Sequence, residues 1–174
     1  MNMVQDLAAR TLLVILVAAV VQDFMYMKIS NRLILMGILF SLAFGFMTGG
    51  LRQVLYVLVN ISFPVFVLYL FYLLGVLGAG DIKLFSIIGG FTNFKLLTGC
   101  MFYSFVAAAV IAVGKMLYNR NLRISVFKAG IFFRSIPREG LVSYHREWAE
   151  RRNLMHFSVP ILIGYMVAVL HWKL

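Results

Sequence analysis

The sequence has little cysteine, few acids and few charges of either sign. Cys100 is the one cysteine among 174 residues, which excludes an intrachain disulfide and a cysteine-rich zinc site. The three histidines, His145, His156 and His171, are not spaced as metal ligands on one helix face. We therefore expect neither a metal nor a cofactor. Only six residues are acidic, and 13% are charged, which is too few for an ordinary soluble domain.

The composition is that of a membrane protein. Hydrophobic residues make up 63% of the chain, and the mean hydropathy is +0.95. A spanning helix needs about 20 residues to cross about 30 Å of hydrocarbon, so five or six spans would use most of the sequence. The chain is too short for a soluble domain in addition to such a bundle. We expect one membrane-embedded domain over residues 1–174.

The apolar runs predict an all-α, polytopic bundle of about six transmembrane helices. They cover residues 7–27, 33–47, 54–77, 82–94, 97–117 and 157–172, and the fourth is short and preceded by glycines. The first run lacks the basic start and the cleavage site of a signal peptide, so we expect it to be a helix. Pro64 predicts a kink in the third segment and Pro160 the start of the last.

The basic residues predict the orientation. If residues 82–94 count as the fourth helix, twelve Lys and Arg side chains fall in or beside the first, third and fifth loops, and four fall on the other side. The positive-inside rule then places the odd loops in the cytoplasm and both termini outside. Residues 119–156 are expected to form a basic cytoplasmic loop, either an ordinary loop or an amphipathic helix on anionic lipid. Topology and lipid account for the net charge of +10, without nucleic acid.

Two of the six acids stand at the ends of apolar segments, where a carboxylate is rare and costly. Asp23 lies 13 residues after Arg10, and Asp81 lies 14 residues before Lys95. If these basic residues mark the outer boundary, each acid lies about 20 Å deeper, near the cytoplasmic side. The two carboxylates are therefore expected at the same level.

Paired carboxylates suit acid–base chemistry, because like charges at close range leave one group protonated and the other ionised. In peptide hydrolysis the ionised group takes a proton from water, while the protonated group polarises the scissile carbonyl. Glycines such as Gly78 and Gly80 let an extended substrate approach the backbone.

Three other roles for the acids remain open at this point. They could pair with Lys28 or Lys83 to hold helices together, or relay protons or a cation in a small membrane transporter. They could also serve assembly in a structural subunit of a secretion complex. Ion flux, peptide cleavage and the tolerance of neutral variants distinguish these functions.

The sequence also resembles a known family. Residues 78–84, GAGDIKL, match the GxGD-[IV]-K-L signature of the type 4 prepilin peptidases, which are membrane-embedded aspartic proteases and include the archaeal preflagellin peptidases. Asp23 is followed by KISNRLI at 28–34, similar to the family's Asp-to-Ile-Pro-Asn segment, and lies 58 positions before Asp81. The similarity extends to residues 159–164. It implies that Asp23 and Asp81 are the catalytic pair.

The resemblance also implies a substrate and a location. Family members remove a short basic leader from prepilin-like precursors at the cytoplasmic face of the bacterial inner membrane. Ser30 replaces a proline found in many relatives, and the cysteine tetrad of the methylating domain is missing. The chain thus resembles the short, peptidase-only form of tight-adherence (Flp-type) pilus systems, in which another protein would methylate the product. The particular pilin and the oligomeric state do not follow from the sequence.

Other residues near the acids are expected to have supporting roles. Lys83 follows Asp81 by two positions and could act on that acid, contact the substrate or extend to the lipid headgroups. Asn31 is expected to cap the second helix or to hydrogen-bond near Asp23. Asp6 precedes Arg10 on the presumed outer side and is not expected to be catalytic. Gly89 and Gly90 are expected to allow close helix packing.

Overall fold

The computed structural model describes residues 3–74, 77–118 and 157–173, apart from the side chains of residues 116, 118 and 173. Within these ranges the regular secondary structure is helical, without strands, as the sequence predicts, and short turns join the helices. The helices are α1 (Met3–Tyr26), α2 (Asn31–Leu73), α3 (Ala79–Phe91), α4 (Phe94–Tyr118) and α7 (Ser158–Lys173). The expected basic loop at 119–156 lies outside the described residues.

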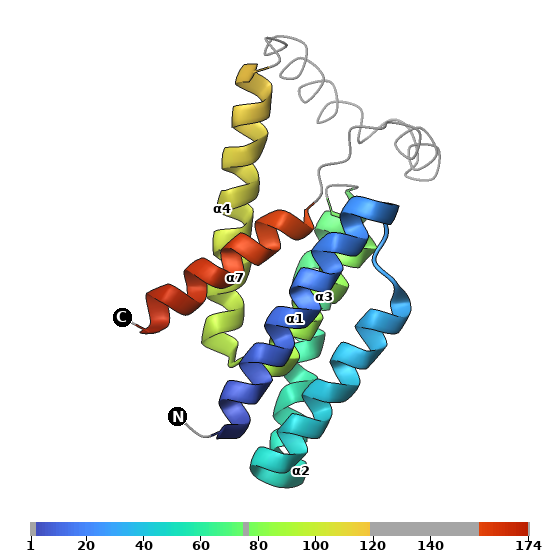
Figure 1. Cartoon of the computed structure of the whole chain (residues 1–174), viewed down its shortest axis with the longest axis vertical. Coiled ribbons are helices and arrows are strands. Elements are labelled where there is room, and N and C mark those ends of the chain that lie inside the picture. The colour runs from blue at the N-terminus through green and yellow to red at the C-terminus, as the bar shows by residue number, and fades with distance from the viewer. Residues whose placement is uncertain (1–2, 75–76, 119–156, 174) are drawn as a thin grey trace. The chain divides into compact units, whose positions relative to one another are not determined.

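Helix α2 contains two of the predicted segments. The backbone is non-helical at Gly49 and Gly50, and Gly50 has a φ of 62°, which favours glycine. The two arms on either side run in opposite directions (Figure 1). They match the segments predicted at 33–47 and 54–77, whereas the expected total of six helices is not confirmed: the described residues form five. Pro64 lies inside the second arm, and the non-helical angles are found at the glycines instead.

Three of the described helices are long and apolar enough to cross a membrane: α1, α2 and residues Phe94–Lys115 of α4. Helix α7 is apolar but shorter. Helix α3 has 13 residues, about 20 Å at 1.5 Å per residue, which is less than the roughly 30 Å of hydrocarbon. Large apolar side chains face outward, for example Phe66 at 83% and Leu51 at 76% exposure. Such an apolar surface is typical of a protein embedded in lipid.

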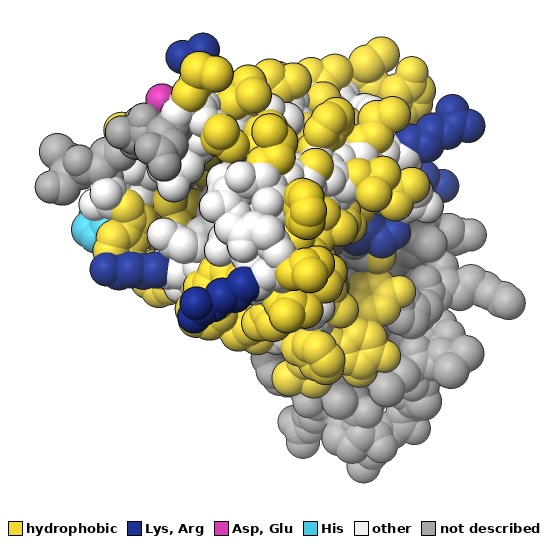
Figure 2. All heavy atoms as spheres, turned by 90° about the horizontal axis from the view of Figure 1, so that it is seen from below, with side chains coloured by type: hydrophobic (Ala, Val, Ile, Leu, Met, Phe, Trp, Pro, Cys, Tyr) yellow, Lys and Arg dark blue, Asp and Glu magenta, His cyan; other side chains and the backbone are white. Residues whose placement is uncertain are grey.

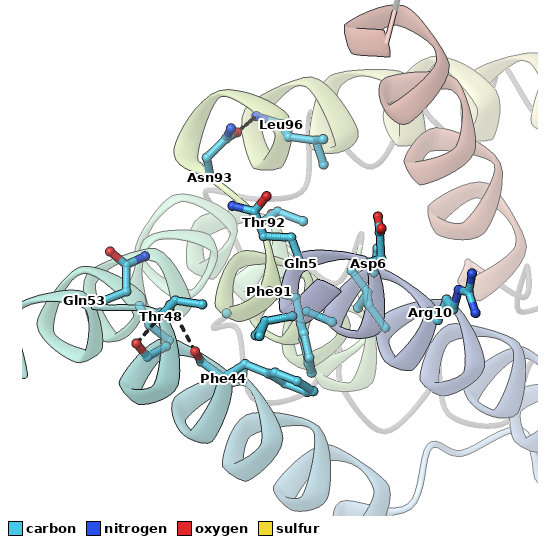
Figure 3. Close-up of a pocket in the computed structure, with 18 of the residues that line it drawn as sticks. Gln5, Asp6, Arg10, Phe44, Thr48, Gln53, Phe91, Thr92, Asn93 and Leu96 are labelled. Carbon is cyan, nitrogen blue, oxygen red and sulfur yellow. Dashed lines mark hydrogen bonds between the residues drawn. The ribbon is translucent and has the colours of Figure 1, made fainter. Parts of the chain in front are cut away.

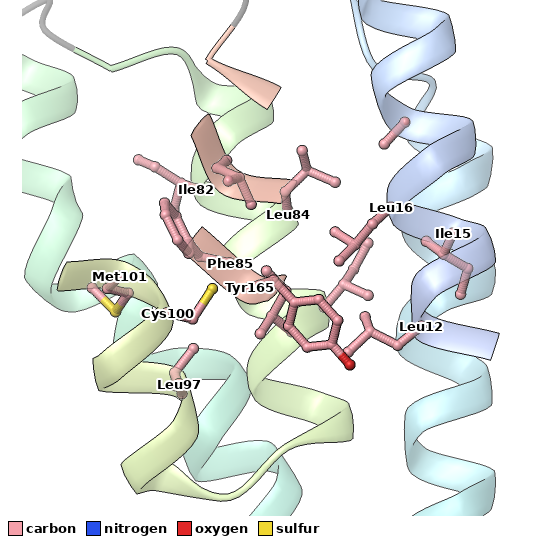
Figure 4. Close-up of a cluster of buried hydrophobic side chains, with 14 of the residues drawn as sticks. Leu12, Ile15, Leu16, Ile82, Leu84, Phe85, Leu97, Cys100, Met101 and Tyr165 are labelled. Atoms are coloured by element: carbon pink, nitrogen blue, oxygen red, sulfur yellow. The ribbon is translucent and has the colours of Figure 1, made fainter. Parts of the chain in front are cut away.

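Helix α3 is the most buried part of the fold. Eight of its 13 residues are buried, and it packs mainly against α2. The ring of Phe85 in α3 belongs to a core that also includes Leu16 of α1, Cys100 of α4 and Tyr165 of α7 (Figure 4). This packing fixes α3 among its neighbours, although the helix is too short to cross the bilayer.

Contacts divide the chain into two compact units. One comprises Met1–Val106 and His156–Leu174, and thus holds α1, α2, α3, the first half of α4 and α7. The other comprises Ala107–Met155, of which the described part is the second half of α4. All the site contacts below lie within the first unit.

Candidate active site

Asp23 lies in the last turn of α1 and is half-buried. Its backbone carbonyl accepts a hydrogen bond from the Met27 N–H at 2.9 Å, where the helix ends. Its side-chain Oδ2 accepts a hydrogen bond of 2.6 Å from the hydroxyl of Ser158, the first residue of α7. The carboxylate is therefore fixed between the end of one helix and the start of another.

The connection after Asp23 is short and ordered. Met27 has a φ of 51°, which turns the chain sharply after α1. The Ser30 N–H donates to the side-chain oxygen of Gln22 at 3.0 Å, and the Ser30 hydroxyl accepts from the Arg32 N–H at 3.2 Å. Ser30 is thus the N-cap of α2, a position for which serine is well suited. The expectation that Asn31 caps this helix was wrong.

Asp81 lies in the first turn of α3 and is also half-buried. Its Oδ2 accepts a hydrogen bond of 3.1 Å from the N–H of Gly78, and its own N–H donates to the Gly78 carbonyl at 3.1 Å. A Cβ on Gly78 would lie 3.1 Å from this carboxylate oxygen. A glycine at this position therefore leaves room for the acid beside the backbone.

The second glycine of the motif touches the α1–α2 connection. A Cβ on Gly80 would lie 3.3 Å from Cδ1 of Ile29. The turn that follows Asp23 therefore rests directly on the segment that carries Asp81. Gly78 and Ala79 remain exposed beside this contact, which leaves backbone accessible next to the acid.

Three helix ends meet at this site: the C-terminal end of α1 and the N-terminal ends of α3 and α7 (Figure 1). Two ionised carboxylates that approach one another at this point would repel. The positive ends of the α3 and α7 dipoles lie at Asp81 and Asp23 respectively, which offsets part of that repulsion. Acids from distant parts of the sequence are thus brought together.

A family model for the type IV leader peptidase family matches residues 11–113. The chain belongs to this family. Both Asp23 and Asp81 lie in the matched part, whereas Ser158 lies beyond it. Searches of curated proteins and of solved structures gave no match. The chain is accordingly a peptidase, with apolar helices that fit a membrane protein.

Lys83 of this leader peptidase does not share a helix face with Asp81, because residues two apart lie on opposite sides of a helix. Its Nζ donates a hydrogen bond of 2.9 Å to Oδ1 of Asn31. Both side chains are exposed, and the bond joins the start of α2 to the start of α3. Lys83 and Asn31, which were predicted separately, thus form one contact beside the acids.

The same peptidase has a large hollow at the opposite end of the helices. It has a volume of about 910 Å³, and Gln5, Asp6, Arg10, Gln53 and Asn93 are among its lining residues (Figure 3). Seen from that end, hydrophobic side chains cover the outer sides of the molecule, and uncharged polar and backbone atoms gather between them (Figure 2).

This hollow is not where the paired acids meet. Asp6 and Asp23 are 17 residues apart on α1, or about 25 Å along the helix. No group of three His, Cys, Asp or Glu side chains in the described ranges could hold a metal. The candidate active site of this peptidase is therefore the part of the fold where the ends that carry Asp23 and Asp81 meet, which is separate from the hollow.

Sequence reasoning missed two residues of the site. Gln22 precedes Asp23, but nothing in the sequence indicates that its amide would bind the backbone of the following turn. Ser158 is the second residue of the last apolar segment and lies two residues before Pro160, a pattern typical of a helix start. That pattern predicts the helix, but not the acid that the hydroxyl contacts.

Proposed function

We propose that the chain is an intramembrane aspartic endopeptidase that removes the short basic leader from type 4 prepilin-like precursors. Asp23 and Asp81 are its acid–base pair. The observation that carries the proposal is the contact of Ile29 with Gly80, which joins the turn after Asp23 to the start of α3, where Asp81 lies. Membership of the leader peptidase family supports the substrate class.

In this mechanism one carboxylate is ionised and the other protonated. The ionised group takes a proton from a water molecule as the water oxygen attacks the scissile carbonyl, while the protonated group donates its proton to the carbonyl oxygen. The tetrahedral intermediate then collapses. The acid formed from the first carboxylate protonates the leaving amine, and the second carboxylate takes the proton of a hydroxyl of the intermediate as the carbonyl forms again. Neither a metal nor a side-chain nucleophile takes part.

The glycine segment has the properties that an extended substrate requires. Gly78 and Ala79 are exposed and lie within three residues of Asp81, so a peptide strand could lie against the backbone there without meeting a large side chain. The hydrogen bond from Lys83 to Asn31 supports a positioning role for this pair. It keeps the starts of α2 and α3 together beside the acids.

The distribution of charge supports an active site that faces the cytoplasm of a bacterial cell. Lys28 lies in the connection after α1, and Arg32 and Lys83 lie near the starts of α2 and α3, so all three are close in the chain to the helix ends that carry the acids. The positive-inside rule places such a side in the cytoplasm. Anionic lipid is the expected neighbour of these cations.

The test uses purified protein in detergent and a synthetic prepilin-like peptide with a basic leader, a glycine and an apolar helix. Mass spectrometry identifies the new N-terminus. Wild-type protein is expected to cut after the glycine. Asp23→Asn and Asp81→Asn are each expected to lower the rate by about 10³-fold, because acid–base catalysis by positioned groups contributes 10² to 10⁴.

Asp6→Asn is the matched control, because it makes the same chemical change on α1 but at the far end of that helix. It is expected to cleave at the wild-type rate. Normal cleavage by either Asp23→Asn or Asp81→Asn would overturn the mechanism. Proton or cation flux in liposomes without any cleavage would instead support the transporter.

A further inference from the structure

Ser158 is a buried hydroxyl that contacts one of the paired acids. It is the first residue of α7 and is 1% exposed. Its Oγ donates to Asp23 Oδ2 at 2.6 Å, although the two residues are 135 positions apart in the sequence. A hydroxyl–carboxylate distance of 2.5–2.7 Å is typical of a charge-assisted hydrogen bond, which is stronger than one between neutral groups.

The helix that carries Ser158 is firmly held. Ile161 and Ala168 are fully buried, and Tyr165 is 5% exposed, so one face of α7 belongs to the core. A Cβ on Gly164 would lie 2.7 Å from Cα of Ser104 in α4, so the two backbones approach as closely as a glycine allows. The position of the Ser158 hydroxyl is therefore set by the packing of the whole helix.

The start of α7 is compatible with a serine hydroxyl that donates to a carboxylate. Pro160 is the third residue of the helix, where a missing N–H breaks no intrahelical hydrogen bond. The positive end of the helix dipole also faces the carboxylate that accepts from Ser158. The dipole therefore favours a negatively charged partner at this point.

We propose that Ser158 is a positioning residue for peptide cleavage: its hydroxyl holds the Asp23 carboxylate in the orientation that faces Asp81. This inference rests on the proposed function. In a bare side chain the carboxylate of an aspartate rotates about χ1 and χ2. A donor fixed by α7 restricts that rotation and keeps the acids paired before the substrate binds.

The test compares Ser158→Thr with Ser158→Val. Thr and Val have nearly the same shape, but only Thr keeps the hydroxyl, so any steric cost at this buried position is common to both. We expect kcat of Ser158→Val to fall about 30-fold below that of Ser158→Thr. KM should agree within twofold, since Ser158 is not expected to touch the substrate. Ser158→Ala, which adds no volume, should lose kcat like Ser158→Val.

A second measurement does not depend on cleavage. The infrared carboxylate band of Asp23 is isolated by subtracting the spectrum of Asp23→Asn. It should have the same frequency in wild type and Ser158→Thr, and should shift in Ser158→Val and Ser158→Ala. Equal bands in all four proteins, or equal kcat for the Thr and Val variants, would overturn the inference. If wild type does not cleave at all, the proposed function fails, and the infrared comparison still decides whether Ser158 orients Asp23.

Discussion

The two ends of α3 use glycine in different ways. At the first end, a Cβ on Gly78 would meet the tip of the Asp81 side chain, and one on Gly80 would meet the tip of Ile29. At the last end, a Cβ on Gly89 would collide with the backbone carbonyl of Asn60, whose carbon would lie only 3.0 Å away. The tip of a side chain can move, whereas a helix backbone within a packed core cannot.

The contrast separates the part of the helix that carries Asp81 from the part that anchors it. Gly89 and Gly90 allow both arms of α2 to approach α3, since Gly90 faces Ser41 on the first arm and Gly89 faces Asn60 on the second. Asn60 also donates to the Thr92 carbonyl at 3.1 Å, just after the helix. The end near Asp81 is instead held by hydrogen bonds and adjustable side chains. Substitutions at the two ends should therefore affect different properties.

Gly89→Ala should have the largest effect. Overpacking against the backbone of Asn60 costs up to about 3 kcal/mol, and the higher helix propensity of alanine returns about 1 kcal/mol. We expect the free energy of unfolding to fall by about 2 kcal/mol, measured by denaturant titration in detergent. An unchanged unfolding curve would show that α2 and α3 can separate here without cost.

The sequence predicted the helical segments because their signal is local. Runs of apolar residues, the glycines before Asp81 and Pro160 near the last helix each depend on neighbours in the chain, and the described helices follow them closely. The equal depth of Asp23 and Asp81 was predicted by counting from Arg10 and Lys95, since the rise of a helix per residue is fixed. The structure brings the turn after Asp23 and the start of α3 into contact at Ile29 and Gly80.

Contacts between distant segments could not be predicted in this way. The bond from Ser158 to Asp23 depends on the angle at which α7 crosses α1, which hydropathy does not specify. The bond from Lys83 to Asn31 likewise depends on how the starts of α2 and α3 meet. The N-cap of α2 is Ser30, one residue before the Asn31 that we expected. The exact end of a helix is the least certain feature of a sequence pattern.

Gly80→Ala should have an intermediate effect and should act on catalysis. Its Cβ would press on Cδ1 of Ile29 at 3.3 Å, so the turn after Asp23 must move by a few tenths of an ångström. A shift of 1 Å can cost about 10²-fold in rate, so we expect about a tenfold loss of kcat, with little change in unfolding free energy. Ile29→Val removes Cδ1, and the double variant should regain most of the rate. A double variant as slow as Gly80→Ala alone would exclude Ile29 as the cause.

Gly114→Ala should have the smallest effect and opposite sign on stability. No atom of the described residues lies within 4 Å of the position its Cβ would take, so the new methyl group meets no neighbour in α4. Alanine is favoured over glycine inside a helix by about 1 kcal/mol at most. We expect a small rise in unfolding free energy and an unchanged cleavage rate. A loss of stability like that of Gly89→Ala would mean that an added methyl group destabilises these helices at any position. The backbone of Asn60 would then not be the cause of the loss expected for Gly89→Ala.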